Sequence, residues 1–372
     1  MKNTFDGKML NKKEIIVISS IYTKGCGISS FTGDLTSYFE AFLKIKSIKL
    51  KLSFRSNPII YFFQATRLFF NVLLFKNFNS SVKNILLEYT PTTTGPLIYP
   101  LVFLLKKINN LKVILEIHEN TEVYNKSIFY KFFVLQEAKL IKICDNVIVH
   151  NEIHANYVLK KYGEYFDKKK LRIIPIPLFK PNKTKFNTPK FRERKDFIVF
   201  GQIRKSKNYD LLIKAYSKFI KRNANTRHDL LIAGNTNDNG YLKEIKNYVS
   251  LYKINERVKF LGYIDDKEMV NLFKNSLAIV LLYSKVTQSY PFSLSISHGL
   301  PSITSDLEYF TNFFKIHKTG LSSSLDLNSI VEKMENISSN EKTYSIMQKK
   351  CKEAMDKYSP NIIARDYEKL FD

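Results

Sequence analysis

A loop rich in cations follows the apolar run Phe197–Gly201 and carries Arg204 and Lys207 just before a helical pattern that starts near Asn208. Two cations beside the N-terminus of a helix, where backbone N–H groups lack partners, form a strong site for an anion. The arrangement therefore predicts a site for a diphosphate group. A solvated basic loop is the alternative interpretation in a chain with so many lysines.

Two further loops have the composition of anion-binding turns. Gly25 and Gly27 follow the first apolar run, and the segment Thr287–Ser289 precedes Pro291, which is expected to open a short helix. Glycine lets a backbone approach a ligand closely, and hydroxyl and N–H groups can face a phosphate. The G-x-G-x-x-G spacing is absent because Ser30 stands at the third position, so an ordinary tight turn explains the two glycines equally well.

Histidines follow two apolar runs in the first half of the chain. His118 lies near the end of the run Lys112–Asn120, and His150 and His154 come at and after the end of the next run. A lone histidine is most often structural, but one at the carboxyl end of a strand can contact a ligand in an interdomain cleft. We predict this role for His118 and rank the other two lower. No group of residues has metal-ligand spacing, so no metal cofactor is expected.

The elements that must position these residues alternate between strand-like and helical runs, which predicts an α/β fold of two Rossmann-like domains facing each other across a cleft. The expected strands are residues 14–20, 84–89, 112–120, 146–151 and 171–176, then 197–201, 229–235, 257–263, 277–284 and 301–306. The predicted domains are residues 1–180 and 196–355. A polar stretch, residues 181–195, is the expected linker, and residues 356–372 are the expected C-terminal helix, which would pack back on the first domain.

The composition is that of a globular protein with an excess of positive charge. The 372 residues include 59 Lys and Arg against 34 Asp and Glu, which gives a net charge of +25, and 44% of residues are hydrophobic. Global disorder is excluded by this balance. The charge would suit nucleic acid, an anionic membrane or a phosphorylated small molecule, but no nucleic-acid-binding module is recognisable, so nucleic acid is not an expected partner. Compositional drift toward lysine explains much of the charge equally well.

Cysteine usage and hydropathy predict a cytoplasmic protein. Cys26, Cys144 and Cys351 form no paired motif, and no signal peptide is recognisable. The apolar stretch 59–75 is interrupted by Gln64 and Arg67, and the stretch 96–105 is shorter than a bilayer requires. We expect buried or interfacial helices there, either covering the first sheet or making peripheral contact with the inner face of an anionic membrane.

Several of these motifs occur together in an order that resembles a family 4 glycosyltransferase of the GT-B class, especially its TQS-containing subgroup. The motifs are Gly25-Cys26-Gly27, His118, a PIP turn at 175–177, FGQIRKSKN, LLIAGN, VKFLGYIDDKEMVNLF, TQS before HGLPSITSD, and KTGLSSSLD. The resemblance covers essentially the full chain and is densest in the second half. It implies that residues 1–180 bind the acceptor and that residues 196–355 bind a nucleotide sugar.

The resemblance also implies roles for individual residues. Arg204 and Lys207 match the basic pair at the diphosphate, and His118 matches a histidine that contacts the donor sugar. The remaining matches are to positions that contact the nucleotide or its phosphates: Gly27, Asn235, Gly262, Tyr263, Gln288 and Ser289.

The chain departs from the family pattern at several of these loops. Val286 and Leu294 stand where many members carry two glutamates, Tyr290 replaces the glycine after TQS, and Asn208 replaces the second residue of a Lys-Gly pair. Gln202 stands where an arginine is common. The glutamate pair that binds ribose and positions the donor sugar in those members is therefore absent here.

The function that follows is transfer of a hexosyl group from a nucleoside-diphosphate sugar to a glycan or lipid-linked acceptor, in polysaccharide or glycoconjugate biosynthesis. The resemblance implies retention of anomeric configuration, and the sugar nucleotide is expected as a substrate rather than a cofactor. The alternative is a catalytically decayed GT-B subunit that acts as a binding partner of another transferase.

Overall fold

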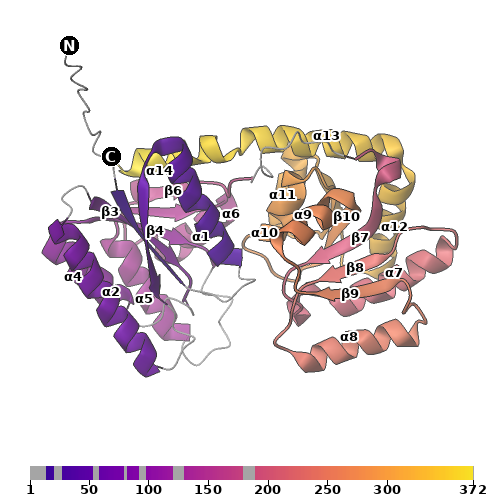
Figure 1. Cartoon of the computed structure of the whole chain (residues 1–372), viewed down its shortest axis with the longest axis horizontal. Coiled ribbons are helices and arrows are strands. Elements are labelled where there is room, and N and C mark those ends of the chain that lie inside the picture. Colours follow the sequence, from indigo (N-terminus) through magenta and orange to yellow (C-terminus); the bar gives the residue numbers. More distant parts are fainter. Residues whose placement is uncertain are drawn as a thin grey trace, which may run out of the picture. The chain divides into compact units, whose positions relative to one another are not determined.

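The computed structural model describes residues 14–20, 27–52, 58–78, 82–91, 98–119, 130–178 and 189–371. These residues fall into two compact units, Met1–Pro175 with Ile363–Asp372 as unit 1, and Ile176–Ile362 as unit 2. Each unit is built on a six-stranded sheet flanked by helices (Figure 1). The structure confirms the predicted α/β fold class with two Rossmann-like domains.

The sheet of unit 1 has the strand order β2-β1-β3-β4-β5-β6, and every neighbouring pair is parallel. Its strands are β1 (Glu14–Ser20), β2 (Lys46–Leu52), β3 (Val82–Tyr89), β4 (Lys112–Ile117), β5 (Asn146–Val149) and β6 (Leu171–Ile173). The central strands read as nearly continuous apolar runs because helices cover both of their faces.

Helices cover the two faces of the unit 1 sheet in different ways. One face, which includes Leu87 and Leu115, packs against α2 (Pro58–Phe78), α4 (Ile98–Asn109), α5 (Tyr130–Ile143) and α6 (Glu152–Tyr162). The opposite face carries Glu88 and Glu116, and it contacts α1 (Gly27–Tyr38) and the end of α14 (Pro360–Phe371). Among the described residues, no helix combines the length and the apolar character needed to cross a membrane.

The sheet of unit 2 has the order β12-β11-β10-β7-β8-β9 and is also parallel throughout. Its strands are β7 (Lys195–Phe200), β8 (Leu230–Ala233), β9 (Val258–Gly262), β10 (Ser276–Leu281), β11 (Ser302–Ser305) and β12 (Gly320–Ser323). Its helices are α7 (Tyr209–Arg222), α8 (Asn239–Leu251), α9 (Asp266–Asn275), α10 (Tyr290–Ser297), α11 (Glu308–His317), α12 (Leu327–Ser339) and α13 (Glu341–Lys357).

Capping residues set the starts of two helices in unit 2. Asp265 caps α9 by accepting the N–H of Glu268 (2.8 Å), and Glu268 returns a bond to the N–H of Asp265 (3.0 Å). This reciprocal capping box satisfies two N–H groups at the helix end. Pro291 lies in the first turn of α10, whose N-cap is Ser289.

Arg194 is the buried charge around which part of unit 2 is organised, although it lies in the stretch that we predicted as a linker. Its guanidinium has 0% exposure and donates to the carbonyls of Phe273 (3.2 Å) and Ser276 (2.9 Å) at the end of α9. It also donates to those of His298 (3.4 Å) and Gly299 (3.2 Å) after α10. Carbonyls at helix C-termini lack intrahelical partners and carry partial negative charge, so one cation satisfies two helix ends.

Substitution Arg194→Ala is expected to lower the free energy of unfolding by about 3–5 kcal/mol, because it leaves buried carbonyls without donors. Arg192→Ala is the matched control, since the Arg192 side chain is exposed and makes only a surface ion pair with Glu341. Chemical denaturation of the full chain, followed by circular dichroism, measures both variants. Equal stability of the two variants would contradict the anchoring role.

Candidate functional site

The carboxyl ends of β7, β8 and β9 are joined by backbone hydrogen bonds through glycines. The N–H of Gly201 donates to Ala233 (2.9 Å), and the N–H of Gly234 donates to Gly262 (2.7 Å). Gly234 has a φ of +150°, and a Cβ there would lie 2.0 Å from the carbonyl oxygen of Gly201. Only glycine fits at this position, so the three strand ends form one continuous rim.

Lys207 lies over this rim. A Cβ on Gly201 would lie 2.9 Å from the Lys207 ammonium nitrogen, which also lies 5.3 Å from the centre of the Tyr283 ring. The lysine is 9% exposed, and burial together with the nearby charge of Arg204 lowers its pKa to about 7. Among the described residues, no carboxylate is within ion-pair distance of Lys207, so its ammonium is stabilised mainly when an anion binds.

Arg204 and Lys207 belong to the same short turn, as predicted. Arg204 is exposed and precedes the 3-10 helix η5 (Lys205–Lys207), which leads into α7 through Asn208. Asn208 has the left-handed values φ 52° and ψ 45°, and its side chain donates to the carbonyl of Leu282 (2.8 Å). Asparagine tolerates this left-handed conformation better than most residues do. The turn is therefore kept although asparagine stands where glycine was expected.

The TQS segment lies beside the same turn, at the start of α10. Pro291 Cγ would lie 3.5 Å from a Cβ on Gly201, which brings the first turn of α10 close to the rim. Ser289 is buried and accepts the N–H of Phe292 (3.3 Å), while its own N–H donates to the Tyr309 hydroxyl (3.3 Å). The Ser289 backbone is therefore committed to a protein contact, and Gln288 is the partly exposed member of the pair.

The predicted nucleotide-contacting residues after β8 and β9 lie on the same rim. Asn235 and Tyr263 are exposed, and Gly262 has a φ of +66°. The carbonyl of Asn235 accepts the N–H of Ile203 (2.8 Å), which ties this loop to the Arg204 turn. Unit 2 therefore brings together Arg204, Lys207, Asn235, Gly262, Tyr263 and the TQS segment.

The two positions without glutamates are part of the hydrophobic core. Leu294 is 3% exposed, and Val286 packs against the same cluster of buried side chains as Leu294. Neither position presents a carboxylate to a ligand. Any contact with a ribose in this unit must come from other groups on the rim.

In unit 1, His118 lies in a buried polar cluster with Glu116 and His150. The rings of His118 and His150 are 5.2 Å apart, and the ring of Phe31 stands edge-on to both. His150 Nδ1 donates to the carbonyl of Ile174 (2.9 Å), so its Nε2 carries a lone pair, and it lies 3.3 Å from Glu116 Oε1. Sequence spacing could not reveal this cluster, because β4 and β5 contribute its members from separate strands.

The cluster is arranged to hold a proton. Burial raises the pKa of Glu116 well above its usual range, and burial lowers the pKa of His150 to about 4. Both groups are therefore neutral, with Glu116 Oε1 3.3 Å from His150 Nε2, while the Tyr367 hydroxyl donates to Glu116 Oε1 (2.6 Å). The potential ligand atoms of Glu116, His118 and His150 lie within 4.8 Å of one another, so this is also the donor set that a metal ion would meet. Burial and the neighbouring imidazoles of His150 and His154 lower the pKa of His118, so its ring is neutral at pH 7.

Glu88 extends the cluster across the sheet, because it pairs with Glu116 in the register of β3 and β4. The Thr32 hydroxyl of α1 donates to Glu88 Oε2 and contacts Ser19 Oγ (3.0 Å). Burial raises the pKa of Glu88 to about 7. A carboxylate near the end of an apolar strand, as in NILLEY and KVILEI, is the sequence signal that could have identified both glutamates.

The glycine loop of unit 1 is described only in part. Gly27 is the first residue of α1, whereas Gly25 and Cys26 lie outside the described residues. Cys144 and Cys351 are buried free thiols.

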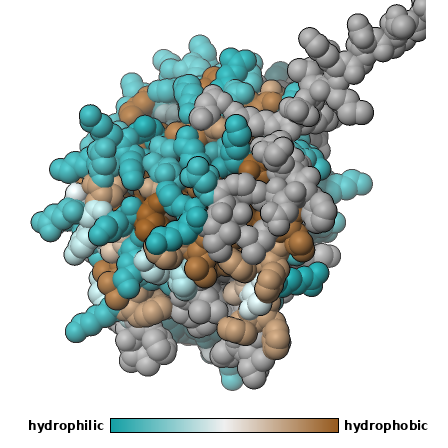
Figure 2. Space-filling view, turned by 90° about the vertical axis from the view of Figure 1, so that its left-hand side faces the viewer, coloured by the Kyte–Doolittle hydropathy of each residue, from teal (hydrophilic) through white to brown (hydrophobic). Residues whose placement is uncertain are grey.

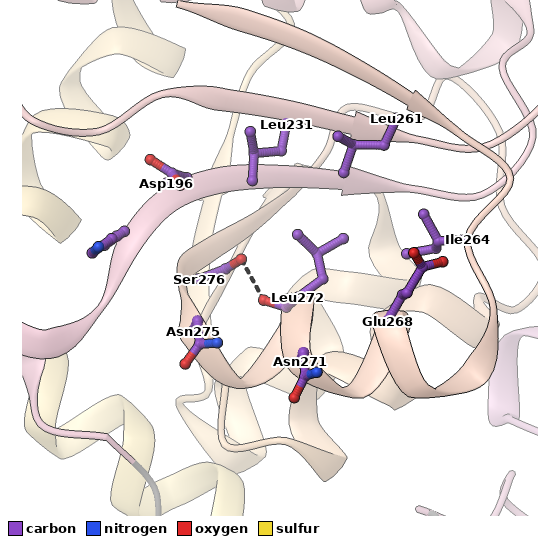
Figure 3. A pocket seen from close by; sticks show the side chains of 10 residues that line it. Asp196, Leu231, Leu261, Ile264, Glu268, Asn271, Leu272, Asn275 and Ser276 are labelled. Carbon is purple, nitrogen blue, oxygen red and sulfur yellow. Dashed lines mark hydrogen bonds between the residues drawn. The ribbon is translucent and has the colours of Figure 1, made fainter.

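A hollow of about 430 Å³ lies elsewhere on unit 2, between the sheet and α9. Leu231 and Leu261 from the strands and Leu272 from α9 point into it (Figure 3). Its lining includes neither Arg204 nor Lys207, and its Leu261 and Ile264 flank the rim residues Gly262 and Tyr263 in sequence. The hollow is therefore separate from the turn that carries Arg204 and Lys207, which we call the cationic turn.

Comparison with known proteins identifies related domains. Residues 181–355 match the family model described as "Glycosyl transferases group 1". Mannosylfructose-phosphate synthase of Agrobacterium fabrum is 23% identical over 198 residues, which cover 50% of this chain and 42% of that protein. The chain thus matches less than half the length of this curated relative.

Two solved structures share the fold over nearly the whole chain. Sucrose-phosphate synthase from Thermosynechococcus elongatus has a TM-score of 0.75 at 16% identity, covering 97% of this chain and 98% of that one. Anabaena Alr3699/HepE, solved in complex with UDP and glucose, has a TM-score of 0.71 at 12% identity, covering 96% and 98%. The second half of the chain thus matches a glycosyl transferases group 1 domain, and the chain as a whole shares the GT-B fold of these solved structures.

Substitution Glu88→Gln is expected to change how stability depends on pH. In the wild type, the folded carboxyl keeps its proton up to about pH 7 while the unfolded one loses it near pH 4.5, so this group's contribution to stability falls as the pH rises between those values. Glutamine does not ionise, so the variant does not lose stability in this way as the pH rises. It should be more stable than the wild type by roughly 2–3 kcal/mol at about pH 8, with little difference at about pH 4.

Urea denaturation at several pH values measures this difference, and the histidines contribute equally to both proteins. Glu40→Gln, on an exposed residue of the same unit, is the control. A constant difference between wild type and Glu88→Gln at all pH values would show that Glu88 is ionised in the folded protein.

Proposed function

We propose that this chain transfers a hexosyl group from a nucleoside-diphosphate sugar to a glycan or lipid-linked acceptor. The observation that carries the proposal is the pairing of Arg204 with a buried Lys207 at the carboxyl ends of the unit 2 strands, without a carboxylate partner for Lys207 in the described part of the chain. A diphosphate is the ligand that supplies the missing negative charge. The group 1 match spans both residues, and Anabaena HepE, which shares the fold, was solved in complex with UDP and glucose.

The two cations would act on the leaving group. Transfer breaks the bond between the anomeric carbon and a phosphate oxygen, which leaves an oxocarbenium-like carbon and a diphosphate whose negative charge grows. A cation that is already held in place stabilises this growing charge without reorganising during the reaction. Lys207 is well placed for this role because packing against Tyr283 and Gly201 restricts its ammonium. This role needs no metal ion.

His118 would contact the donor sugar as a neutral imidazole. Its lowered pKa keeps the ring uncharged, so any contact with the sugar would be a hydrogen bond to a hydroxyl and not a charge interaction. We further propose that the anomeric configuration is retained and that the product is part of a polysaccharide or glycoconjugate, in keeping with the family that the motifs resemble.

A catalytically decayed subunit is the second candidate. The apolar residues Val286 and Leu294 favour it, because Leu294 is buried in the core where an active relative would present a carboxylate. Such a subunit would bind another transferase without turning over a donor itself.

Nucleotide binding is expected to be coupled to proton uptake. Free Lys207 has a pKa of about 7, so at about pH 8 most molecules carry a neutral amine, and a bound diphosphate would restore the charge. Titration calorimetry with UDP and with GDP, in two buffers of different ionisation enthalpy, should show uptake approaching one proton per nucleotide. The preferred nucleotide can first be found by thermal stabilisation, since a ligand that binds only the folded state raises its melting temperature.

Lys207→Met should abolish this proton uptake, and Lys205→Met is the control because Lys205 is exposed in the same turn. Binding without proton uptake in the wild type would contradict the assignment of Lys207. Binding of neither nucleotide would contradict the donor site altogether.

The Arg204→Ala/Lys207→Ala double variant should lower donor turnover by at least about 100-fold, since each lost contact to a developing charge costs about 2.7–4 kcal/mol. Release of nucleoside diphosphate from the preferred donor sugar is the measurement. Nucleotide binding without any turnover in the wild type would favour the decayed subunit, and unchanged turnover in the double variant would refute the leaving-group role.

A further inference from the structure

The outer layer of unit 1 exposes an unusual number of large apolar side chains. Helices α2, α4 and α5 pack side by side over one face of the sheet (Figure 1). On these helices, large apolar residues remain between 42% and 66% exposed: Phe62, Phe63, Phe70, Leu74, Leu104, Phe132 and Leu135. We call these residues the outer apolar face. Large apolar side chains that stay exposed together on neighbouring helices indicate an interaction site.

Helix α2 shows why this surface is not an accident of partial burial. Its inward side packs Ala65, Leu68 and Val72 against the sheet, as a covering helix should. Its outward side is nonetheless apolar, because Phe63, Phe70 and Leu74 recur at helical spacing with Arg67 among them. A helix that is hydrophobic on all sides is normally buried on all sides, so the outward stripe of α2 calls for a partner.

The charges around the outer apolar face have a single sign. The cations whose side chains are described on the three helices are Arg67, Lys106, Lys107, Lys131, Lys139 and Lys142. The one acidic residue on these helices, Glu137, has 0% exposure, and Lys106 alone of the described cations pairs with a nearby carboxylate, that of Asp145 (2.6 Å). Figure 2 views the molecule from the side on which α2 and α4 lie and shows hydrophobic residues interspersed with hydrophilic ones.

We propose that the outer apolar face docks on an anionic lipid membrane. Aromatic and leucine side chains would enter the interfacial layer while lysines and arginine contact the lipid headgroups, and each of these terms adds to binding. A second copy of the chain fits the surface poorly, because a symmetric contact would oppose two arrays of cations. The proposal does not depend on glycosyl transfer, so the two can fail separately.

Co-sedimentation with vesicles of phosphatidylcholine alone, and of phosphatidylcholine mixed with phosphatidylglycerol, tests the proposal on the full chain. Binding is expected to the mixed vesicles and to weaken as salt is added. Phe62→Ser/Phe63→Ser should weaken it on the order of tenfold per ring. Arg67→Gln/Lys131→Gln should weaken it roughly fivefold per cation.

Matched controls come from unit 2, where Leu251 and Ile316 are each 68% exposed. Leu251→Ser/Ile316→Ser and Lys243→Gln/Lys274→Gln should leave vesicle binding unchanged, and circular dichroism shows whether each variant is folded. Absence of binding to the mixed vesicles at low salt would overturn the proposal. So would equal losses in the unit 1 and unit 2 variants, or light scattering that shows a dimer which the Phe62→Ser/Phe63→Ser variant dissociates.

Discussion

A single guanidinium that is cut off from water constrains much of unit 2. Arg194 is held by carbonyl oxygens at the ends of α9 and α10, and in the described part of the chain it has no carboxylate partner. A buried cation is tolerable only when every nearby acceptor is aimed at it, so the two helix ends are held in one arrangement. The N-terminal end of the same α10 carries its N-cap Ser289 and Pro291, which lies beside Gly201.

The two units treat buried polar groups in opposite ways. Unit 2 holds Lys207 close to neutrality, because burial and Arg204 both oppose its charge. Unit 1 keeps carboxyls and imidazoles neutral by burying them together, with Tyr367 and Thr32 as hydrogen-bond donors. Such neutral networks give direction to hydrogen bonds without creating an electrostatic field. Under the proposed function, the cations of unit 2 would meet the anionic end of a sugar nucleotide, and the neutral cluster of unit 1 would meet its polyol end.

Sequence patterns predict the buried centre of each sheet better than its edges. The two strands that we did not predict, β2 and β12, both lie at sheet edges. KSIKLKL alternates lysine with apolar residues, and GLSS is largely polar, because an edge strand packs on fewer neighbours and needs no apolar run. The cationic turn could be predicted because its residues are adjacent in sequence. The cluster of Glu88, Glu116 and His150 could not be predicted, because it depends on the register between strands. The sequence also does not show that Asn208 adopts the left-handed conformation in which it can replace the expected glycine.

The return of α14 to unit 1 has a consequence for how the chain reaches its folded state. Tyr367 follows Glu116 by 251 residues, and Asn84 is bonded to the Phe371 carbonyl (2.8 Å) across 287 residues. During synthesis, the sheet of unit 1 is therefore made long before the helix that covers its polar face, and all of unit 2 emerges in between. Contacts so distant in sequence form slowly, and surfaces that wait for them are open to association with other chains. A ribosome-bound chain would thus leave Glu116 and Asn84 without their hydrogen-bond partners from α14 until that helix is complete.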